Sequence, residues 1–206
     1  MIYNLKNCDF LYRKKERKSK IVVITGPMFS GKTSRLLEFI ERESIAGKNV
    51  LLFKPEIDKR YSKNSVVTHK GYKVKAIISP INFKAGDFIA KKSREADVVG
   101  IDEAQFWDEN IHFPEFLDVL ADSGKVVYVS TLNKDHRGKA FKNSKDLLGL
   151  ADKVYTLTAV CTKCGGEATF TQRIVDNKPV FGDTILIGGK NLYEPRCREC
   201  FVRKQG

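Results

Sequence analysis

Residues 20–46 read KIVVITGPMFSGKTSRLLEFIERESIA, an apolar run followed by a glycine-rich turn and an amphipathic segment. The β-branched run 20–25 predicts a strand, and apolar residues at helical spacing in 32–46 predict a helix. The turn has two glycines, a lysine and a hydroxyl at the offsets of a phosphate-binding loop, whose backbone N–H groups surround a phosphate chain. Its residues are Gly26, Pro27, Met28, Phe29, Ser30, Gly31, Lys32 and Thr33. The stretch predicts a nucleotide site in which Lys32 supplies charge and Thr33 binds magnesium, the alternative being a turn without a ligand.

Apolar runs recur along the chain with helix-like stretches between them. This alternation predicts an α/β fold, a mainly parallel sheet with flanking helices like that of phosphate-loop NTPases. The sequence contains no internal repeat. The expected strands are 21–25, 50–53, 74–78, 98–101, 126–130 and 153–157, and the expected helices are 32–46, 83–95 and 112–123.

The chain has 206 residues and a formal net charge of +12. Such a charge is common in nucleic-acid-binding proteins, but much of it is concentrated between Arg13 and Lys20, at the end of an N-terminal extension spanning 1–19 and at the first residue after it. No stretch has the ~20 apolar residues that a membrane-spanning helix needs, and the N-terminus lacks the apolar segment of a signal peptide. We therefore expect a cytoplasmic protein that has no membrane partner and requires no nucleic acid.

Two acids follow the apolar run 98–101. In phosphate-loop folds, a carboxylate at this place faces magnesium, so we expect Asp102 to order the ion. Glu103 comes next and could accept a proton from an attacking hydroxyl. Without the upstream glycine loop, the pair would indicate a surface turn.

The segment 54–72 has no strong periodicity and predicts a long loop near the phosphates. It contains Asp58 and Arg60. Arg60 has two alternative interpretations, as a phosphate ligand or as part of a mobile loop.

Four cysteines form two C-x-x-C pairs, Cys161 with Cys164 and Cys197 with Cys200. This spacing is typical of a structural zinc site, in which four thiolates leave no open position. Two disulfides are the alternative, and they are rare in a reducing compartment. The fifth cysteine, Cys8, lies in the N-terminal extension and is expected to be an idle thiol.

The residues between the two cysteine pairs form a long excursion that zinc would anchor. Its aromatic side chains and glycines suit a flat heterocycle, whereas a hairpin for assembly or for nucleic acid is the other interpretation. The candidate residues are Thr171, Phe181, Gly182, Ile187, Gly188, Gly189 and Tyr193.

Together, the motifs and their order resemble the zinc-containing type II family of thymidine kinases, from about residue 20 to residue 200. They are GPMFSGKT (26–33), KPEIDKRY (54–61), IDEAQFW (101–107), CTKC (161–164) and CREC (197–200). The resemblance implies transfer of the γ-phosphoryl group of ATP to the 5′-hydroxyl of thymidine, and possible use of deoxyuridine, with Mg²⁺ and a structural Zn²⁺. It also implies a homotetramer inhibited by the triphosphate end product.

The resemblance further implies a kinase domain over 20–160 and a zinc-binding lasso domain over 161–206, with the lasso closing over the base. The same resemblance implies that Glu103 is the general base. The phosphates and magnesium are served by Lys32, Thr33, Asp58, Arg60, Asp102 and Gln105. The nucleoside pocket is lined by Met28, Phe106, Leu132, Phe141, Ile187 and Tyr193.

One stretch departs from the family pattern Leu-Asp-x-Asp-Phe-Arg-Gly-x-Pro-Phe. This chain has Asn133, His136 and Ala140 at three of those positions, and His136 stands where a phenylalanine would pack against the base. Substrate preference therefore follows less directly from the resemblance than reaction type does. Two other functions compete: a nucleic-acid-stimulated ATPase, in which the two acids activate water, and a binding protein that has lost activity.

Overall fold

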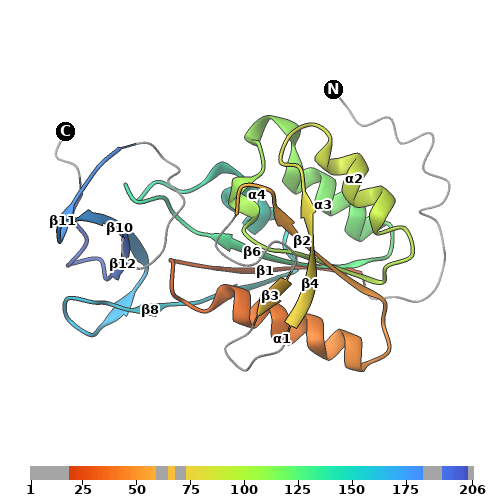
Figure 1. Cartoon of the computed structure of the whole chain (residues 1–206), viewed down its shortest axis with the longest axis horizontal. Coiled ribbons are helices and arrows are strands. Elements are labelled where there is room, and N and C mark those ends of the chain that lie inside the picture. Colours follow the sequence, from red (N-terminus) through yellow and green to blue (C-terminus); the bar gives the residue numbers. More distant parts are fainter. Residues whose placement is uncertain (1–18, 59–64, 68–72, 183–191, 204–206) are drawn as a thin grey trace.

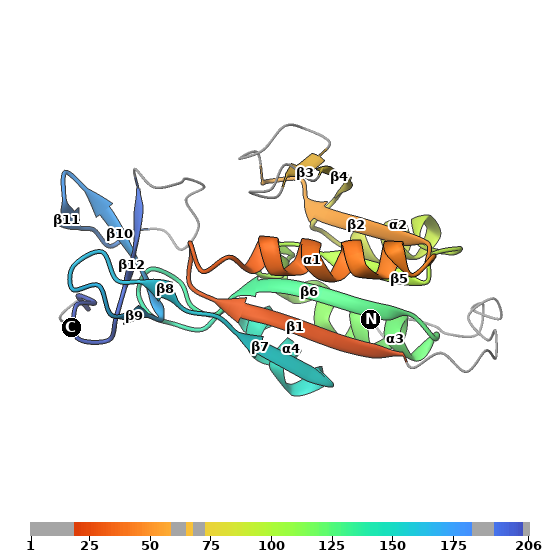
Figure 2. The ribbon, with the colours of Figure 1, turned by 90° about the horizontal axis from the view of Figure 1, so that it is seen from below.

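A computed structural model of the chain describes residues 19–58, 65–67, 73–182 and 192–203. Its main feature is a sheet in which six strands run parallel and one edge strand is antiparallel, in the order β3-β4-β2-β5-β6-β1-β7 (Figures 1 and 2). The strands are β1 (Lys20–Gly26), β2 (Val50–Pro55), β3 (Ser65–Val67), β4 (Lys73–Ser79), β5 (Val98–Ile101), β6 (Val126–Leu132) and β7 (Lys153–Thr156). The predicted α/β class with a mainly parallel sheet is confirmed.

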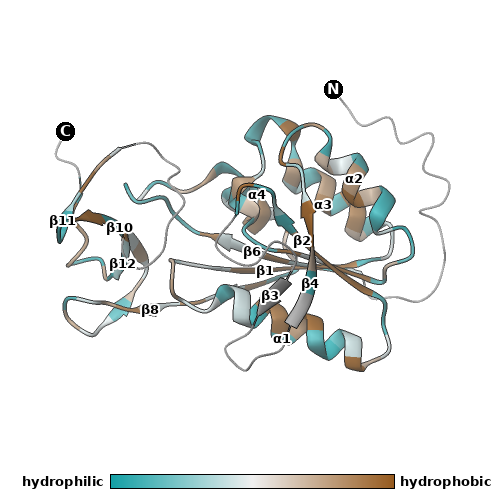
Figure 3. Ribbon diagram, viewed as in Figure 1, coloured by the Kyte–Doolittle hydropathy of each residue, from teal (hydrophilic) through white to brown (hydrophobic). Residues whose placement is uncertain are grey.

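Helices cover both faces of this sheet. On one face lies α1 (Lys32–Ile45), which packs Leu36 and Leu37 against side chains of β1, β2, β5 and β6. On the other face lie α2 (Ala85–Lys92), α3 (Phe113–Asp122) and α4 (Lys142–Leu150). Figure 3 shows hydrophilic and hydrophobic residues alternating along α1 and α2, as expected for helices with one buried face.

Because successive side chains of a strand point to opposite faces, each central strand contributes to two cores. In β2, for example, Leu52 joins the cluster under α1 and Phe53 joins the cluster under the other helices. Gly100 in β5 leaves room for α1, since a Cβ there would lie 2.6 Å from Cδ1 of Ile40. The helix consequently packs close to the sheet.

A second, smaller module lies beyond the carboxyl ends of β1 and β6 (Figures 1 and 2). It consists of a β-hairpin of two short strands and a three-stranded antiparallel sheet. Its strands are β8 (Ala159–Val160), β9 (Glu167–Ala168), β10 (Phe170–Val175), β11 (Lys178–Pro179) and β12 (Tyr193–Arg196). Two short 3₁₀ helices, η3 (Ala104–Phe106) and η4 (Glu109–Ile111), follow β5.

Two elements differ from the sequence-based expectations. The helix α4 was not expected, because its sequence KNSKDLLGL combines poor helix formers with few apolar positions. Strand β3 lies inside the segment 54–72, which we predicted to be a loop, and pairs antiparallel with β4 through a short β-branched stretch. Among the described residues, no helix is long and apolar enough to cross a membrane.

Candidate functional site

The glycine-rich loop joins the end of β1 to the start of α1. Gly26 is required because a Cβ there would lie 2.4 Å from the carbonyl oxygen of Leu157. Gly31 has a φ of 81° and immediately precedes α1, a backbone conformation that glycine adopts without strain. Phe29 has a φ of 66°, which is uncommon for a residue with a side chain. Steric crowding at Gly26 and the left-handed backbone at Gly31 therefore explain why glycine occupies these two positions.

Side chains of the loop turn inward toward one carbonyl group. The Lys32 ammonium donates to the carbonyl oxygen of Pro27 at 2.6 Å, and the Ser30 hydroxyl donates to the same oxygen at 2.8 Å. Lys32 is buried at the N-terminus of α1, whose free N–H groups favour an anion. A buried cation and a helix N-terminus are thus brought together on the α1 side of the sheet.

Asp102 follows β5 directly and lies beside α1. It accepts hydrogen bonds from the Thr33 hydroxyl, at 3.2 and 3.3 Å to its two carboxylate oxygens, and from the Ser130 hydroxyl at the end of β6. Asp102 is 3% exposed. Carboxylate and hydroxyl oxygens are hard ligands of the kind magnesium prefers, so Thr33 and Asp102 fit that ion. Asp58 lies at the carboxyl end of β2, where its N–H donates to Pro55 at 3.0 Å, and it is also buried.

Glu103 is held in an unusual conformation next to this group. Its φ of 57° is left-handed, and its side chain is buried. The Gln105 side-chain amide donates to the Glu103 carboxylate at 2.5 Å, while the Gln105 oxygen accepts from the Leu132 N–H at 2.9 Å and from the Thr131 hydroxyl at 3.2 Å. The amide of Gln105 therefore ties the glutamate to the end of β6, and strain at such a position is typical of functional sites.

The small module reaches this site through the glycine-rich loop. The Met28 N–H donates to the Thr171 hydroxyl in β10 at 3.0 Å. On the neighbouring strand, Tyr193 is buried, and its hydroxyl accepts from Arg173 at 2.9 and 3.2 Å. Residues predicted to face phosphates and residues predicted to face a base are thus in direct contact.

The remaining candidates for the base pocket come from the stretch after β5 and from the segment between β6 and α4. Leu132 ends β6, Phe106 ends η3 and Phe141 immediately precedes α4. Leu132 and Phe141 are buried, and Phe106 is partly buried.

His136 links this segment to the small module. It is 2% exposed, and its Nε2 accepts from the Gly182 N–H at 3.4 Å. Burial, together with the nearby positive charge of Arg173, lowers the pKa of His136 below its usual value. The histidine is therefore neutral near pH 7, with Nε2 serving as an acceptor.

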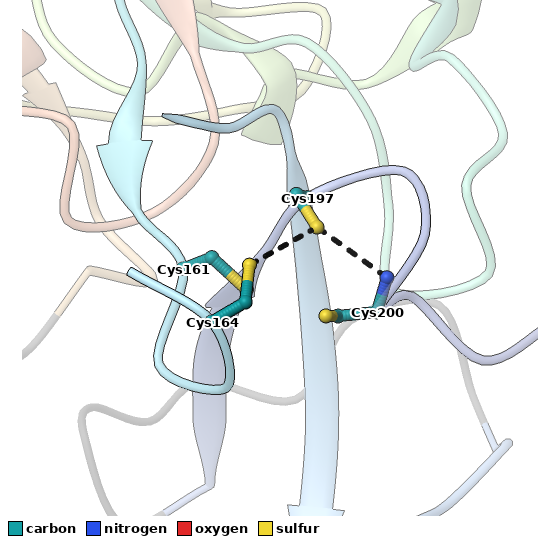
Figure 4. A group of neighbouring side chains, drawn as sticks. All are labelled: Cys161, Cys164, Cys197 and Cys200. Carbon is teal, nitrogen blue, oxygen red and sulfur yellow. Dashed lines mark hydrogen bonds between the residues drawn. The ribbon is translucent and has the colours of Figure 1, made fainter. Parts of the chain in front are cut away.

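The four cysteines of the two C-x-x-C pairs converge at the base of the small module (Figure 4). Their sulfur atoms all lie within 4.8 Å of one another, and all four cysteines are free thiols, so the disulfide alternative is not realised. Burial works against the Cys161 thiolate, but backbone N–H groups, led by that of Cys197, lower the pKa of Cys161 to about 6. Four sulfurs in one cluster fit a tetrahedral zinc ion.

Several predicted residues lie outside the described part of the chain. They are Arg60, which was predicted to bind phosphate, and Ile187, Gly188 and Gly189, which were predicted to line the base pocket. Cys8 and the rest of residues 1–18 also lie outside the described part. Sequence analysis missed two other residues, Ser130 and Arg173, which bond to predicted site residues. The signal for Ser130 was available, because a hydroxyl residue ends the otherwise apolar run 126–130 in which a strand was expected.

Comparison with known proteins places these features in a family. The sequence model of the thymidine kinase family matches residues 19–201. A thymidine kinase of Thermococcus kodakarensis is 45% identical over 181 residues, which cover 86% of this chain and 91% of that protein. Thymidine kinases of Mesoplasma florum and Mycoplasma capricolum are 43% and 42% identical, covering 90% and 88% of this chain and 93% and 88% of their own lengths.

Proposed function

Because this chain belongs to the thymidine kinase family, we propose that it transfers the γ-phosphoryl group of ATP to the 5′-hydroxyl of thymidine, giving the 5′-monophosphate. The observation that carries this proposal is the cluster of Glu103, Asp102 and Thr33 beside the glycine-rich loop. Phosphoryl transfer depends on alignment and charge neutralisation, which Lys32 and a Mg²⁺ ion held by Thr33 and Asp102 would supply.

The proposed roles divide between two sets of residues. The loop N–H groups and Lys32 bind the phosphates of ATP, with Asp58, Arg60 and Gln105 supporting the site. Thr33 and Asp102 would hold Mg²⁺, which neutralises phosphate charge when it is bound. Glu103 accepts the proton of the 5′-hydroxyl as its oxygen bonds to the γ-phosphorus and the bond to ADP breaks. The hydrogen bond from Gln105 orients the Glu103 carboxylate for this task.

The base pocket is proposed on the other side of the loop. Met28, Thr171 and Tyr193 lie where the module meets the kinase sheet, and Phe106, Leu132, His136 and Phe141 complete the pocket with Ile187, Gly188 and Gly189. Zinc at the four cysteines would hold the ends of the covering segment together without entering the chemistry. Family membership also supports a cytoplasmic homotetramer that is inhibited by its triphosphate end product.

A panel of acceptors tests the proposal. Thymidine, deoxyuridine, deoxycytidine and purine deoxynucleosides are incubated with Mg·ATP, and the products are separated by chromatography. We expect a 5′-monophosphate from thymidine, a measurable yield from deoxyuridine, and little ADP without an acceptor. ATP hydrolysis that responds to DNA and ignores nucleosides would reject the kinase in favour of the ATPase alternative.

A further inference from the structure

Lys54 is a buried lysine at the carboxyl end of β2. It is 2% exposed. Leu52, two residues earlier, packs into the cluster under α1, whereas Phe53 packs into the cluster on the opposite face. Because side chains alternate along a strand, Lys54 lies on the α1 face, the face that carries the glycine-rich loop.

The register of the sheet places Lys54 beside Asp102. In the parallel pairing of β2 with β5, Phe53 is opposite Ile101, and the Asp102 N–H donates to the Phe53 carbonyl at 2.9 Å. One residue further along each strand, Lys54 is level with Asp102. In the same way Ser130 is level with Asp102 on β6, since Ile101 is opposite Val129. Lys54, Asp102 and Ser130 thus form a polar row across three neighbouring strands, at the N-terminus of α1.

The surroundings of this ammonium set it apart from other buried lysines. Lys125, at the opposite end of the sheet, donates to the carbonyl oxygens of Arg94 and Ala96 at 3.2 and 2.7 Å, and Lys32 donates to Pro27. Within residues 19–58, 65–67, 73–182 and 192–203, no hydrogen bond or ion pair of the Lys54 ammonium is found, and its nitrogen is not among the fully enclosed side-chain atoms that lack a partner, so the small exposure of Lys54 includes the ammonium. A buried charge without a partner is costly and is seldom kept unless a ligand supplies the opposite charge.

We infer that Lys54 is a further substrate-contacting residue of the kinase, whose ammonium binds the γ-phosphoryl group during transfer. This inference rests on the proposed function. As the general base, Glu103 must lie within reach of the attacking hydroxyl, and that hydroxyl must lie next to the phosphoryl group that it attacks. Because Glu103 directly follows Asp102, the transferred γ-phosphoryl group lies next to the polar row. Lys54 stays protonated throughout: the acceptor proton goes to Glu103, and the electron pair of the broken P–O bond leaves with ADP.

The test compares two nucleotides on Lys54→Met. We expect the affinity for the Mg²⁺ complex of a non-hydrolysable ATP analogue to fall ~10-fold or more, because a charge-assisted contact is lost, while the affinity for Mg·ADP changes less than about 3-fold. The turnover number should fall with the analogue affinity, and Lys54→Arg should recover part of both. The melting temperature of the nucleotide-free protein should stay the same or rise, because a buried charge is removed.

Lys125→Met is the matched control, because it removes a buried ammonium that has backbone acceptors. It should lower the melting temperature and leave both nucleotide affinities unchanged.

Lys54→Gln, which is also neutral, repeats the measurement with a polar side chain. Equal analogue affinities in Lys54→Met and the unmodified chain would overturn the inference, as would an equal loss for ADP and analogue. Failure of both neutral variants to fold would also overturn the inference, because the ammonium would then be needed to stabilise the nucleotide-free protein. Thymidine phosphorylation by the unmodified chain tests the proposed function separately.

Discussion

The proposed phosphate side and the proposed base side of the site are built in different ways. On the phosphate side, the loop after β1, the acids after β5 and the hydroxyl of Ser130 near the end of β6 meet at the carboxyl ends of neighbouring strands. On the base side, the residues come from the segment between β6 and α4 and from strands of the small module, far apart in the sequence. The phosphate side therefore needs only the packed sheet, whereas the base side needs the module to be held in place.

This difference has a functional meaning for a kinase. Phosphates and magnesium are common to many reactions, and residues at the carboxyl ends of a rigid parallel sheet can hold them. The nucleoside must enter, be enclosed and leave again, which requires a cover that is anchored but separate from the sheet. Gln105 joins the two sides, because it bonds to both Glu103 and the Leu132 backbone. Substitutions on each side should therefore separate binding of ATP from binding of the nucleoside.

The largest effect is expected from Glu103→Gln, which removes the general base and leaves the ATP site and the nucleoside site intact. Glutamine keeps the size of the side chain but cannot accept the proton, so turnover should fall by ~10² or more while ATP affinity stays nearly unchanged. Single-turnover rates with thymidine and binding of an ATP analogue measure the two quantities. Glu115→Gln, at an exposed position on α3, is the control and should leave turnover unchanged. Full turnover in Glu103→Gln would remove Glu103 from the role of base.

The same division explains how much the sequence could predict. On the proposed phosphate side, the sequence predicted where the candidate residues lie in the fold, because they belong to two short motifs and the strand–loop–helix pattern fixes where each motif lies in the sheet. The register that aligns Lys54 with Asp102 was not predictable, since it depends on how β2 pairs with β5. The helix α4 was missed because tertiary packing of Leu147, which is fully buried, outweighs a poor local propensity.

On the base side, the sequence predicted the zinc cluster but little of its surroundings. Two C-x-x-C pairs are a local signal, so the convergence of Cys161, Cys164, Cys197 and Cys200 followed from their spacing. The bond between Met28 and Thr171 spans 143 residues of sequence, and no local pattern encodes it. The contact between His136 and Gly182 is likewise non-local.

The second-largest effect is expected from Cys197→Ser, which should weaken nucleoside binding on the base side and leave ATP binding on the phosphate side nearly unchanged. Losing one thiolate weakens zinc binding by ~10-fold or more, and the ends of the covering segment are then no longer held together. We expect kcat/KM for thymidine to fall by a similar factor and ATP affinity to stay nearly constant. Metal analysis should give one zinc per chain before the substitution and less after it. Full zinc content in the variant, or an equal loss of ATP and thymidine binding, would contradict the separation of the two sides.

A smaller effect is expected from Gln105→Ala, which cuts the link between the sides. Glu103 then loses the donor that orients its carboxylate, and the Leu132 N–H loses a buried acceptor. We expect turnover to fall about 10-fold, with a smaller loss of ATP affinity, because one charge-assisted hydrogen bond to the base is lost. Gln105→Glu keeps the shape but places two carboxylates together, and their repulsion should shift the pH–rate profile upward. An unaltered profile in Gln105→Glu would show that the amide does not position Glu103.

The smallest effect is expected at His136, where the base side should respond to acid. Its pKa is lowered in the fold by burial and by Arg173, with a further contribution from Arg137, while Asp135 acts in the opposite direction. The unfolded chain therefore binds a proton near pH 6.5, and the folded chain does so only at lower pH, so stability is lost as pH falls below about 6.5. Protonation also prevents Nε2 from accepting the Gly182 N–H.

His136→Phe should remove this part of the acid sensitivity, on the order of 1 kcal/mol for each unit by which the pKa is lowered. Urea unfolding at pH 7.5, 6.5 and 5.5 measures it, with His112→Asn as a control because His112 is exposed and asparagine tolerates its left-handed backbone. We expect the unmodified chain and His112→Asn to lose stability in parallel between pH 6.5 and 5.5, and His136→Phe to lose less. If His136→Phe follows the same pH curve as the unmodified chain, the base side does not sense acid through this histidine.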